Sequence, residues 1–252
     1  MEKTVHESVQ HLSDDIDILI QNFNNSGELV DLGQRNVIKT FKVKGLNINI
    51  KSFKKPNFLN KVIYTYFRKS KAQRSYEFAN ILISKGIGTP KPMAFVTHND
   101  WIGLTNSYYI CEHIHADLTF RSLVEHPDYE NHEIILRQFT GFSYQLHRLG
   151  IEFKDHSPGN TLIKKGENNQ YDFYLVDLNR MNFHEQMSFD LRMKNLCRLT
   201  PKEEMVRVIA NEYAKQSGEK ENEIFETLWK FTCEFQEKFH RKKALKKKYF
   251  GR

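Results

Sequence analysis

Apolar residues along the chain show two periodicities. A period of two predicts strands, and a spacing of three or four residues predicts helices. Apolar residues recur at helical spacing over residues 5–23, which predicts an amphipathic N-terminal helix. Residues 28–32 predict a short strand, and residues 37–43 and 46–53 alternate as half-buried strands do. We therefore expect three consecutive strands, in an antiparallel meander with a turn at Lys44-Gly45.

Helical spacing dominates the remainder of the chain. It predicts helices over residues 70–85, 132–149 and about 221–240, with Gly86 and Gly150 as stop signals. Further strands are expected over residues 93–97, 107–111, 161–164 and 173–177, the last two across a polar hairpin. Strands followed by helices predict an α+β protein. We place a small antiparallel sheet lobe with its key helix at residues 1–112, and a mainly helical lobe at residues 113–252.

One group of polar residues stands between the predicted elements of the second half. Asp155 and Asn160 follow the long helix, and Asp177 lies at the end of a strand seventeen residues after Asn160. Phosphoryl transfer requires positioned metal, charge neutralisation and an oriented hydroxyl group more than covalent help from the protein. A carboxylate followed five residues later by an amide, with a second carboxylate on the next hairpin, suits that chemistry because Mg²⁺ prefers oxygen ligands.

The quoted order of residues resembles the protein-kinase-like superfamily, and more narrowly the lipopolysaccharide kinases of the Kdo kinase group. The resemblance covers roughly residues 28–200. It rests on these phrases: Lys51-Ser-Phe-Lys-Lys55, Tyr66-Phe-Arg-Lys-Ser-Lys-Ala-Gln-Arg-Ser-Tyr-Glu77, Gly86-Ile-Gly-Thr-Pro-Lys-Pro-Met-Ala94, Leu146-His-Arg-Leu-Gly-Ile151 with Asp155 and Asn160, and Val176-Asp-Leu-Asn-Arg180. It implies a bilobal kinase-like fold and an ATP-dependent kinase that phosphorylates a sugar hydroxyl group, on Kdo in the lipopolysaccharide inner core.

The resemblance also implies roles for individual residues around ATP. Lys51 would hold the α- and β-phosphates, and Glu77 would orient Lys51. Gly33 and Arg35 belong to the phosphate loop, and the strand that ends at Glu112 would form the hinge whose backbone binds adenine.

Carried over in the same way, Asp155 would be the catalytic base. Asn160 and Asp177 would bind Mg²⁺, so the expected cofactors are ATP and Mg²⁺.

Three positions depart from the pattern of the family. The phosphate loop, Gly33-Gln-Arg-Asn36, has one glycine and therefore less freedom for close backbone approach. Phe153 replaces the usual histidine, from which we expect altered packing with the chemistry retained. Asp177-Leu-Asn179 replaces Asp-Phe-Gly, where Asn tolerates a left-handed backbone. These departures leave open a nucleotide-binding pseudokinase scaffold, and the fold leaves open a kinase that acts on a protein or a small molecule.

Charge is unevenly distributed along the chain, whose formal net charge is +7. Residues 1–32 hold seven acidic residues and one basic, whereas residues 33–76 hold twelve basic residues and no acidic one. Residues 238–252 add eight basic residues without an acidic one. We interpret both basic stretches as surfaces that face anions. The first would recognise an anionic glycolipid in preference to RNA, since no RNA-binding module is evident, and the second would contact an anionic membrane. A solvated surface is the alternative for each.

The cysteine content and the absence of long apolar runs indicate the cell compartment in which the protein acts. Three separated cysteines without a CxxC motif argue against disulfides and zinc. No run of residues reaches the length of a membrane span, and no secretory signal is evident. We expect a cytoplasmic enzyme that is peripheral on the inner membrane; its oligomeric state is left open.

Overall fold

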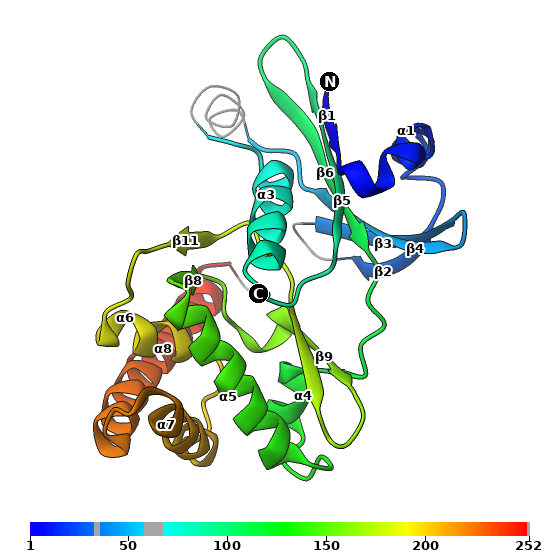
Figure 1. Cartoon of the computed structure of the whole chain (residues 1–252). Coiled ribbons are helices and arrows are strands. Elements are labelled where there is room, and N and C mark those ends of the chain that lie inside the picture. Colours follow the sequence, from blue (N-terminus) through cyan, green and yellow to red (C-terminus); the bar gives the residue numbers. More distant parts are fainter. Residues whose placement is uncertain (33–35, 58–67, 251–252) are drawn as a thin grey trace. The chain divides into compact units, whose positions relative to one another are not determined.

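Two compact units make up the chain in the computed structural model, which describes residues 1–32, 36–57 and 68–250 (Figure 1). The first unit comprises Met1–His115 together with Asp177–Asn179. The second comprises Ala116–Val176 and Arg180–Arg252. The division at residues 115 and 116 falls three residues after the boundary that we predict, and it assigns the short 177–179 segment to the first unit.

A six-stranded antiparallel sheet forms the body of the first unit. Its strand order is β1-β5-β6-β4-β3-β2. The strands are β1 (Glu2–Val5), β2 (Glu28–Leu32), β3 (Asn36–Val43), β4 (Leu46–Phe53), β5 (Pro92–Asn99) and β6 (Leu104–Glu112). The predicted meander is confirmed, because β2 pairs with β3 and β3 pairs with β4, each in antiparallel register.

The expected single helix over residues 5–23 is wrong in its first third. The chain starts with β1, whose residues pair with β5, and continues as a 3₁₀ turn, η1 (Glu7–Leu12), before helix α1 (Ser13–Gln21). Val9 has non-helical backbone angles at the junction. Pairing with the edge of β5 satisfies backbone groups that an edge strand otherwise leaves open. The apolar spacing was informative about burial all the same, since Leu12 and Ile16 are fully buried.

Each face of the sheet is covered by a different helix. Leu12, Ile16 and Ile20 pack with Ile48 and Ile50 of β4 in one apolar cluster, so α1 covers that face. Helix α3 (Lys71–Ser84) packs on β5 and β6 on the other face. Alternation along β4 therefore turns its odd-numbered residues toward the face that α3 covers.

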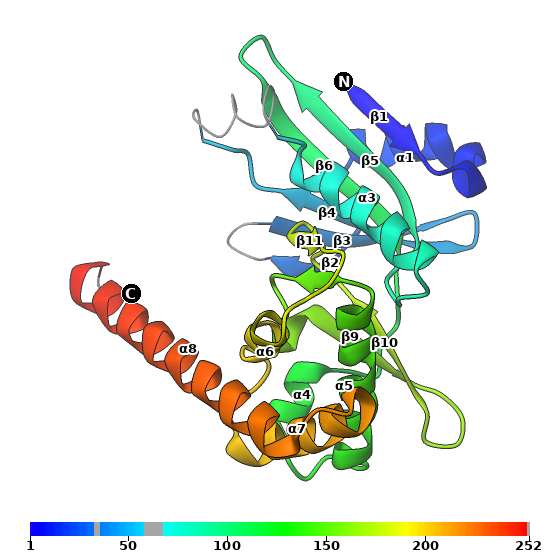
Figure 2. The ribbon, with the colours of Figure 1, turned by 60° about the vertical axis from the view of Figure 1, so that its left-hand side comes forward.

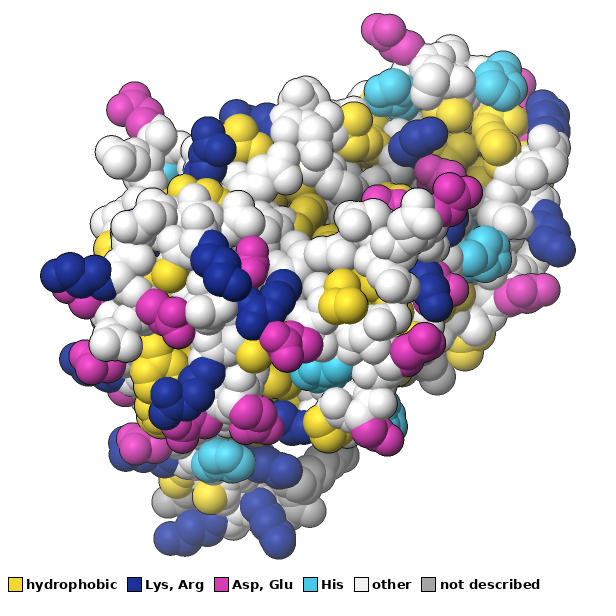
Figure 3. All heavy atoms as spheres, turned by 60° about the horizontal axis from the view of Figure 1, so that its bottom comes forward, with side chains coloured by type: hydrophobic (Ala, Val, Ile, Leu, Met, Phe, Trp, Pro, Cys, Tyr) yellow, Lys and Arg dark blue, Asp and Glu magenta, His cyan; other side chains and the backbone are white. Residues whose placement is uncertain are grey.

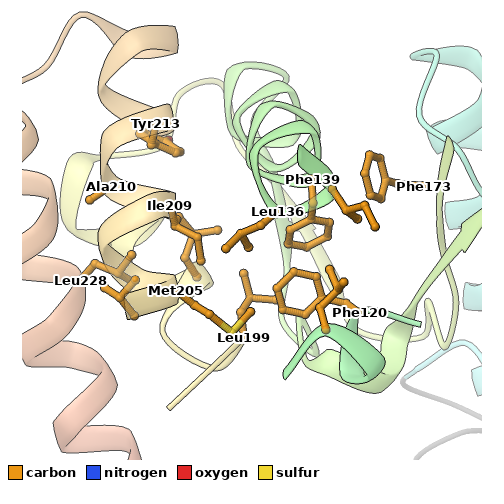
Figure 4. Close-up of a cluster of buried hydrophobic side chains, with 14 of the residues drawn as sticks. Phe120, Leu136, Phe139, Phe173, Leu199, Met205, Ile209, Ala210, Tyr213 and Leu228 are labelled. Carbon is orange, nitrogen blue, oxygen red and sulfur yellow. The ribbon is translucent and has the colours of Figure 1, made fainter. Parts of the chain in front are cut away.

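Five helices and short strands form the second unit. The helices are α4 (Phe120–Glu125), α5 (His132–Arg148), α6 (Phe189–Leu196), α7 (Glu203–Ser217) and α8 (Glu221–Phe250). Apolar residues of α4, α5, α7 and α8 meet in one core, where Leu136 and Phe139 lie between Phe120 and Ile209 (Figure 4). The predicted helices over 132–149 and 221–240 are confirmed, and the second is about ten residues longer than expected.

Short strands of the second unit carry the loop on which the sequence analysis places its chemistry. Strand β8 (Ile151–Phe153) pairs with β11 (Met181–Phe183), and the predicted hairpin is β9 (Thr161–Lys165) with β10 (Tyr171–Leu175). Strand β7 (Leu118–Thr119) joins β9, and the 3₁₀ turn η2 (Pro158–Asn160) precedes it.

The acid-free stretch over residues 33–76 is less available to external anions than its composition indicates. Lys39 donates to three backbone carbonyls in the segment that follows α1, at 2.7 to 3.2 Å, and Lys44 pairs with Asp15 at 2.7 Å. Acidic residues distant in sequence therefore neutralise part of the stretch. Lys54, Lys55 and Arg68 are exposed. Lys61 lies outside the described residues.

No helix among the described residues is long and apolar enough to cross a membrane.

Candidate active site

Lys51 reaches one carboxylate of the predicted set directly. It lies in the middle of the sheet, between Ile38 of β3 and Tyr109 of β6, on the face that α3 covers. Its Nζ donates to Oδ1 of Asp177 at 2.6 Å and lies 5.3 Å from the centre of the Phe53 ring. Only 11% of the Lys51 side chain is exposed. Burial fixes the position of the amine, because a lysine side chain so enclosed has few rotamers left.

Asp177 is held in a backbone conformation that few residues adopt. Its φ is +60°, in the left-handed region, two residues after the end of β10. Nδ2 of Asn179 donates to the same Oδ1 that Lys51 meets, at 2.7 Å. The left-handed residue of this segment is thus Asp177, and Asn179 supplies a hydrogen bond instead of the backbone tolerance that we expected from it. Oδ2 of Asp177 takes part in neither bond.

Helix α3 contributes a different residue from the expected one. Arg74, buried on α3, donates from Nη1 to the backbone carbonyl of Asn179 at 2.7 Å. Arg74 belongs to the basic stretch over residues 33–76 that we interpret as facing anions, and its burial contradicts that interpretation for this residue. Glu77, one turn further on, accepts from Lys69 at 2.7 and 2.9 Å and does not meet Lys51. The pairing of Lys51 with Glu77 is therefore not formed in this structure, and Asp177 takes its place.

The loop that carries Asp155 is closed by its own amide. Nδ2 of Asn160 donates to the backbone carbonyl of Asp155 at 2.8 Å, and the Asn160 backbone N–H donates to Ser157 at 2.9 Å. Since its amide nitrogen is used, the Oδ1 atom of Asn160 is the end of the side chain that can bind a cation. Val176, the residue before Asp177, donates its N–H to the carbonyl of Asn160 at 3.0 Å.

Two arginines meet the carboxylate of Asp155, and neither was singled out by sequence reasoning. Nη1 of Arg180 lies 2.9 Å from Oδ1 of Asp155, and Nη1 of Arg198 lies 3.7 Å from the same atom. Arg180 stands at the end of the quoted Val176–Arg180 phrase, so a signal for it was present. Arg198 follows α6, and nothing in the sequence relates it to Asp155.

A buried polar network fastens the Asp155 loop to the helices. Nδ2 of Asn195, on α6, donates to the carbonyl of Phe153 at 2.9 Å. Oδ1 of the same amide lies 3.2 Å from one ring nitrogen of His147 and 3.2 Å from one of His156. Because an amide oxygen only accepts, both rings donate to it. The other nitrogen of His147 lies 2.9 Å from the Tyr213 hydroxyl group.

Burial keeps both histidines of this network neutral. It lowers the pKa of His147 to about 3 and the pKa of His156 to about 4, because a charged ring loses its hydration there. Burial likewise raises the pKa of the Tyr213 hydroxyl group. Phe153, the departure from the family pattern, is fully buried beside His156, with ring centres 5.8 Å apart. Its backbone is held by Asn195, which explains how the loop stays ordered without the usual histidine.

The other residues predicted to bind ATP are Gly33, Arg35 and Glu112. Gly33 and Arg35 lie outside the described residues. Glu112 is the last residue of β6, with an exposed side chain, and its backbone N–H donates to Lys91 at 2.9 Å. The next N–H, of His113, donates to Asn47 at 2.9 Å.

Oxygen donors at the predicted metal-binding positions suit a hard cation. Oδ1 of Asn160 and Oδ2 of Asp177 are oxygen atoms, the type that Mg²⁺ prefers. Within the described ranges, no group of three or more His, Cys, Asp and Glu side chains is arranged to hold a metal ion. Mg²⁺ bound to either oxygen would need phosphate and water to complete its coordination shell, which is its usual arrangement in proteins.

Comparison with known proteins gives one family and one fold. The family model described as "Lipopolysaccharide kinase (Kdo/WaaP) family" matches residues 23–226. No curated protein matches the sequence. Among solved structures, the chain is similar to "WaaP in complex with acyl carrier protein", with a TM-score of 0.65 and 12% identity, over 96% of this chain and 99% of that one. At such low identity the likeness shows the fold, and it confirms the α+β, kinase-like class that we predict.

Proposed function

Because the chain belongs to the lipopolysaccharide kinase (Kdo/WaaP) family, we propose that it transfers the γ-phosphoryl group of ATP to a hydroxyl group of Kdo in the lipopolysaccharide inner core. Because it belongs to this family, the protein is a kinase whose phosphate acceptor is a hydroxyl group. The molecule that carries this hydroxyl group is a glycolipid. What we propose beyond family membership is that Kdo is the acceptor sugar and that the residues named below carry out the reaction. The observation that carries it is the closed Asp155–Asn160 loop together with the buried pair of Lys51 and Asp177.

Lys51 acts on the nucleotide in this proposal. A buried ammonium group with a fixed position neutralises phosphate charge without reorganising during the reaction. Asp177 holds Lys51 in place, and its Oδ2 atom, which takes part in neither hydrogen bond, would bind the metal ion. In this proposal the backbone of the strand that ends at Glu112 would bind adenine, and Gly33 and Arg35, which lie outside the described residues, would bind the phosphates. We assign Glu77 a supporting role through Lys69, its partner in the structure.

Asp155 acts on the acceptor. Its carboxylate takes the proton of the attacking hydroxyl group, as a base must lie within hydrogen-bond reach of the proton that it removes. Asn160 and Asp177 are the residues that would hold Mg²⁺, which would supply positive charge to offset that of the phosphates. Asn160 also holds the carbonyl of Asp155, so the same side chain that would bind the cation also orients the base.

A phosphate-transfer assay tests this assignment. Purified full-length protein with Mg-ATP and a Kdo-containing lipid A precursor should yield a phosphorylated glycolipid. Asp155→Asn should lower kcat by about a hundredfold to ten-thousandfold, the usual contribution of a general base. Asp172→Asn, which removes an exposed carboxylate from β10, is the matched control and should retain full activity. Phosphate appearing on protein and not on glycolipid would refute the acceptor, and full activity of Asp155→Asn would refute the base.

We further propose that the end of α8 contacts an anionic membrane surface. Side chains 237–248 are exposed, and α8 projects well beyond α6 and α7 (Figure 2). Acidic and basic side chains are interspersed over the face of the helical unit in Figure 3, whereas the basic side chains of this projection stand at the bottom of the view. Phe239 and Leu245 are about half exposed among them. Each Lys or Arg near an anionic leaflet contributes about 1 kcal/mol of attraction.

Vesicle sedimentation tests the membrane contact separately from catalysis. Replacing Lys242, Lys243 and Lys246 by Gln should reduce binding to vesicles with 30% anionic lipid by about a hundredfold, from roughly 1 kcal/mol per residue. The matched control replaces three exposed lysines elsewhere on the unit, Lys215, Lys220 and Lys230, and should bind as the wild type does. Binding that is equal in both variants, or insensitive to salt, would contradict the proposal.

A further inference from the structure

The Asp155 carboxylate is shared by two arginines that are held very differently. Arg198 donates from Nη1 to the backbone carbonyl of Lys154 at 2.7 Å, and its guanidinium lies 5.3 Å from the centre of the Phe235 ring. Only 35% of its side chain is exposed. Arg198 is thus fixed in place by a backbone group and an aromatic ring, and its longer contact of 3.7 Å leaves the carboxylate oxygen accessible.

Arg180 has fewer restraints. Its side chain is 55% exposed, and among the described residues Asp155 is the carboxylate that it meets. Its backbone is fixed, since the carbonyl of Arg180 accepts from the N–H of Lys154 at 3.1 Å. An ion pair so exposed to solvent contributes about 0 to 1 kcal/mol. The side chain can therefore leave Asp155 at little cost while its backbone stays beside the loop.

The hydrogen bond from Arg180 to Asp155 affects how well this carboxylate can act as a base. Nη1 of Arg180 donates to Oδ1 of Asp155 at 2.9 Å. An oxygen that already accepts a charged hydrogen bond is a poorer acceptor for the proton of a substrate hydroxyl group. A guanidinium group has five N–H donors in a planar fork, which matches a carboxylate or a phosphate with two parallel hydrogen bonds.

We propose that Arg180 recognises an anionic group of the acceptor, a carboxylate on the sugar that is phosphorylated or on its neighbour, and that this recognition frees Asp155 for catalysis. The inference rests on the proposed function, since it takes Asp155 as the base. It adds to that function a residue that determines specificity for an anionic acceptor. The short distance from Arg180 to Asp155 places the anionic group close to the reacting hydroxyl group.

The reaction then follows in a balanced step. The acceptor carboxylate binds Arg180, whose guanidinium leaves Oδ1 of Asp155. The hydroxyl proton passes to that oxygen, and the hydroxyl oxygen forms a bond to the γ-phosphorus of ATP. The bond from that phosphorus to the bridging oxygen breaks, and ADP leaves with the electron pair. Arg198 remains on Lys154 throughout and keeps the loop in place.

The test compares an acidic acceptor with its methyl ester, in wild type and in Arg180→Gln. We expect the wild type to prefer the acid by about tenfold or more in kcat/KM, the loss of a charge-assisted hydrogen bond. Arg180→Gln should raise KM for the acid to the value for the ester, without changing KM for ATP. It should also turn over the ester at least as fast as the wild type does, because Asp155 is no longer covered. Arg180→Lys should restore part of the preference.

Arg207→Gln is the matched control. Arg207 on α7 is also an exposed arginine, at 61%, paired with one carboxylate, Glu203. It should keep the wild-type preference, and thermal unfolding should show that all variants fold. An equal preference for the acid in wild type and Arg180→Gln would overturn the inference.

Direct titration of the acid without ATP separates this inference from the proposed function. Binding that Arg180→Gln weakens tenfold, in a protein that phosphorylates no glycolipid, would support the recognition and refute the proposed function. A wild-type protein that neither binds nor phosphorylates the acid would overturn both.

Discussion

Two ion pairs hold the two carboxylates on which the proposed chemistry depends, and they differ in exposure. In the sheet unit Lys51 meets Asp177, and 11% of the lysine side chain is exposed. In the helical unit Arg180 meets Asp155, and 55% of the arginine side chain is exposed. The first cation lies in the middle of a six-stranded sheet, whereas the second stands just before the short strand β11.

This difference in exposure means that the Lys51–Asp177 pair is a permanent part of the site, whereas the Arg180–Asp155 pair can be broken by a ligand. Taking a charge out of water is expensive, so a buried lysine needs its partner at all times. An exposed arginine is hydrated without its partner and can exchange it for a ligand. We therefore expect the buried pair to serve ATP, which every turnover uses, and the exposed pair to sense the acceptor.

Breaking the buried pair should have the largest effect. Asp177→Asn removes the partner of Lys51 and one proposed metal ligand while keeping the shape of the side chain and its tolerance of positive φ. We expect kcat/KM to fall about a thousandfold or more, as for other losses of fixed electrostatic stabilisation. Steady-state kinetics measure it, with Asp172→Asn as control. A fall no larger than that of Arg180→Gln would erase the distinction between the two pairs.

The second largest effect is expected from Asn195, whose side chain fastens the loop that carries Asp155. Asn195→Ala deprives Phe153, His147 and His156 of their shared partner in a buried site. We expect a loss of about 2 to 4 kcal/mol in the free energy of unfolding, since several buried polar groups lose hydrogen bonds. Urea denaturation measures it.

The control for Asn195→Ala is Ser143→Ala on α5. Ser143 is fully buried, and its hydroxyl group has no hydrogen-bond partner among the described residues. Its removal should change stability by less than about 0.5 kcal/mol. Equal effects of the two substitutions would show that the network does not fasten the loop.

Lowering the pH should reduce the stability that the buried network of His147, His156 and Asn195 provides. His147 and His156 are neutral when folded, with pKa values of about 3 and about 4, against 6.5 for a free histidine. Below pH 6.5 the unfolded chain therefore binds more protons, and stability falls as pH falls. Each histidine should contribute a loss of about 2 kcal/mol between pH 7 and pH 5.

Denaturation across this pH range measures the effect, which should vanish above pH 7.5. His156→Gln should make the decline shallower, and replacing the exposed His126 by Gln should leave the decline as it is. A decline that both substitutions change equally would place its origin outside the buried network.

The smallest effect is expected at Glu77, the residue that the sequence led us to expect as the partner of Lys51. Glu77 binds Lys69 in the structure, while Asp177 binds Lys51. Glu77→Gln should therefore lower kcat/KM by no more than about threefold, the scale of an exposed pair. A fall as large as that of Asp177→Asn would restore the Lys51–Glu77 pairing that the sequence led us to expect.

Much of the fold and part of the site were accessible from the sequence. The strand meander and the long helices were predicted because alternation and helical spacing record which side of each element is buried. Asp155, Asn160 and Asp177 stood out through their order between recognisable elements. The N-terminal strand was missed because pairing with β5, far away in the sequence, decides it. The anionic preference of the 33–76 stretch was overestimated for the same reason, since Asp15 reaches Lys44 only in the folded chain.

The sequence by itself determined which residues can do chemistry and the order in which the chain presents them. Tertiary structure decided which of them meet. It paired Lys51 with Asp177, gave Arg74 a backbone carbonyl to bind, and set Arg180 and Arg198 on one carboxylate oxygen. Local patterns report burial and backbone preference, which act over a few residues. The partner of a charged side chain depends on segments up to 126 positions apart, which only the packing of the chain brings together.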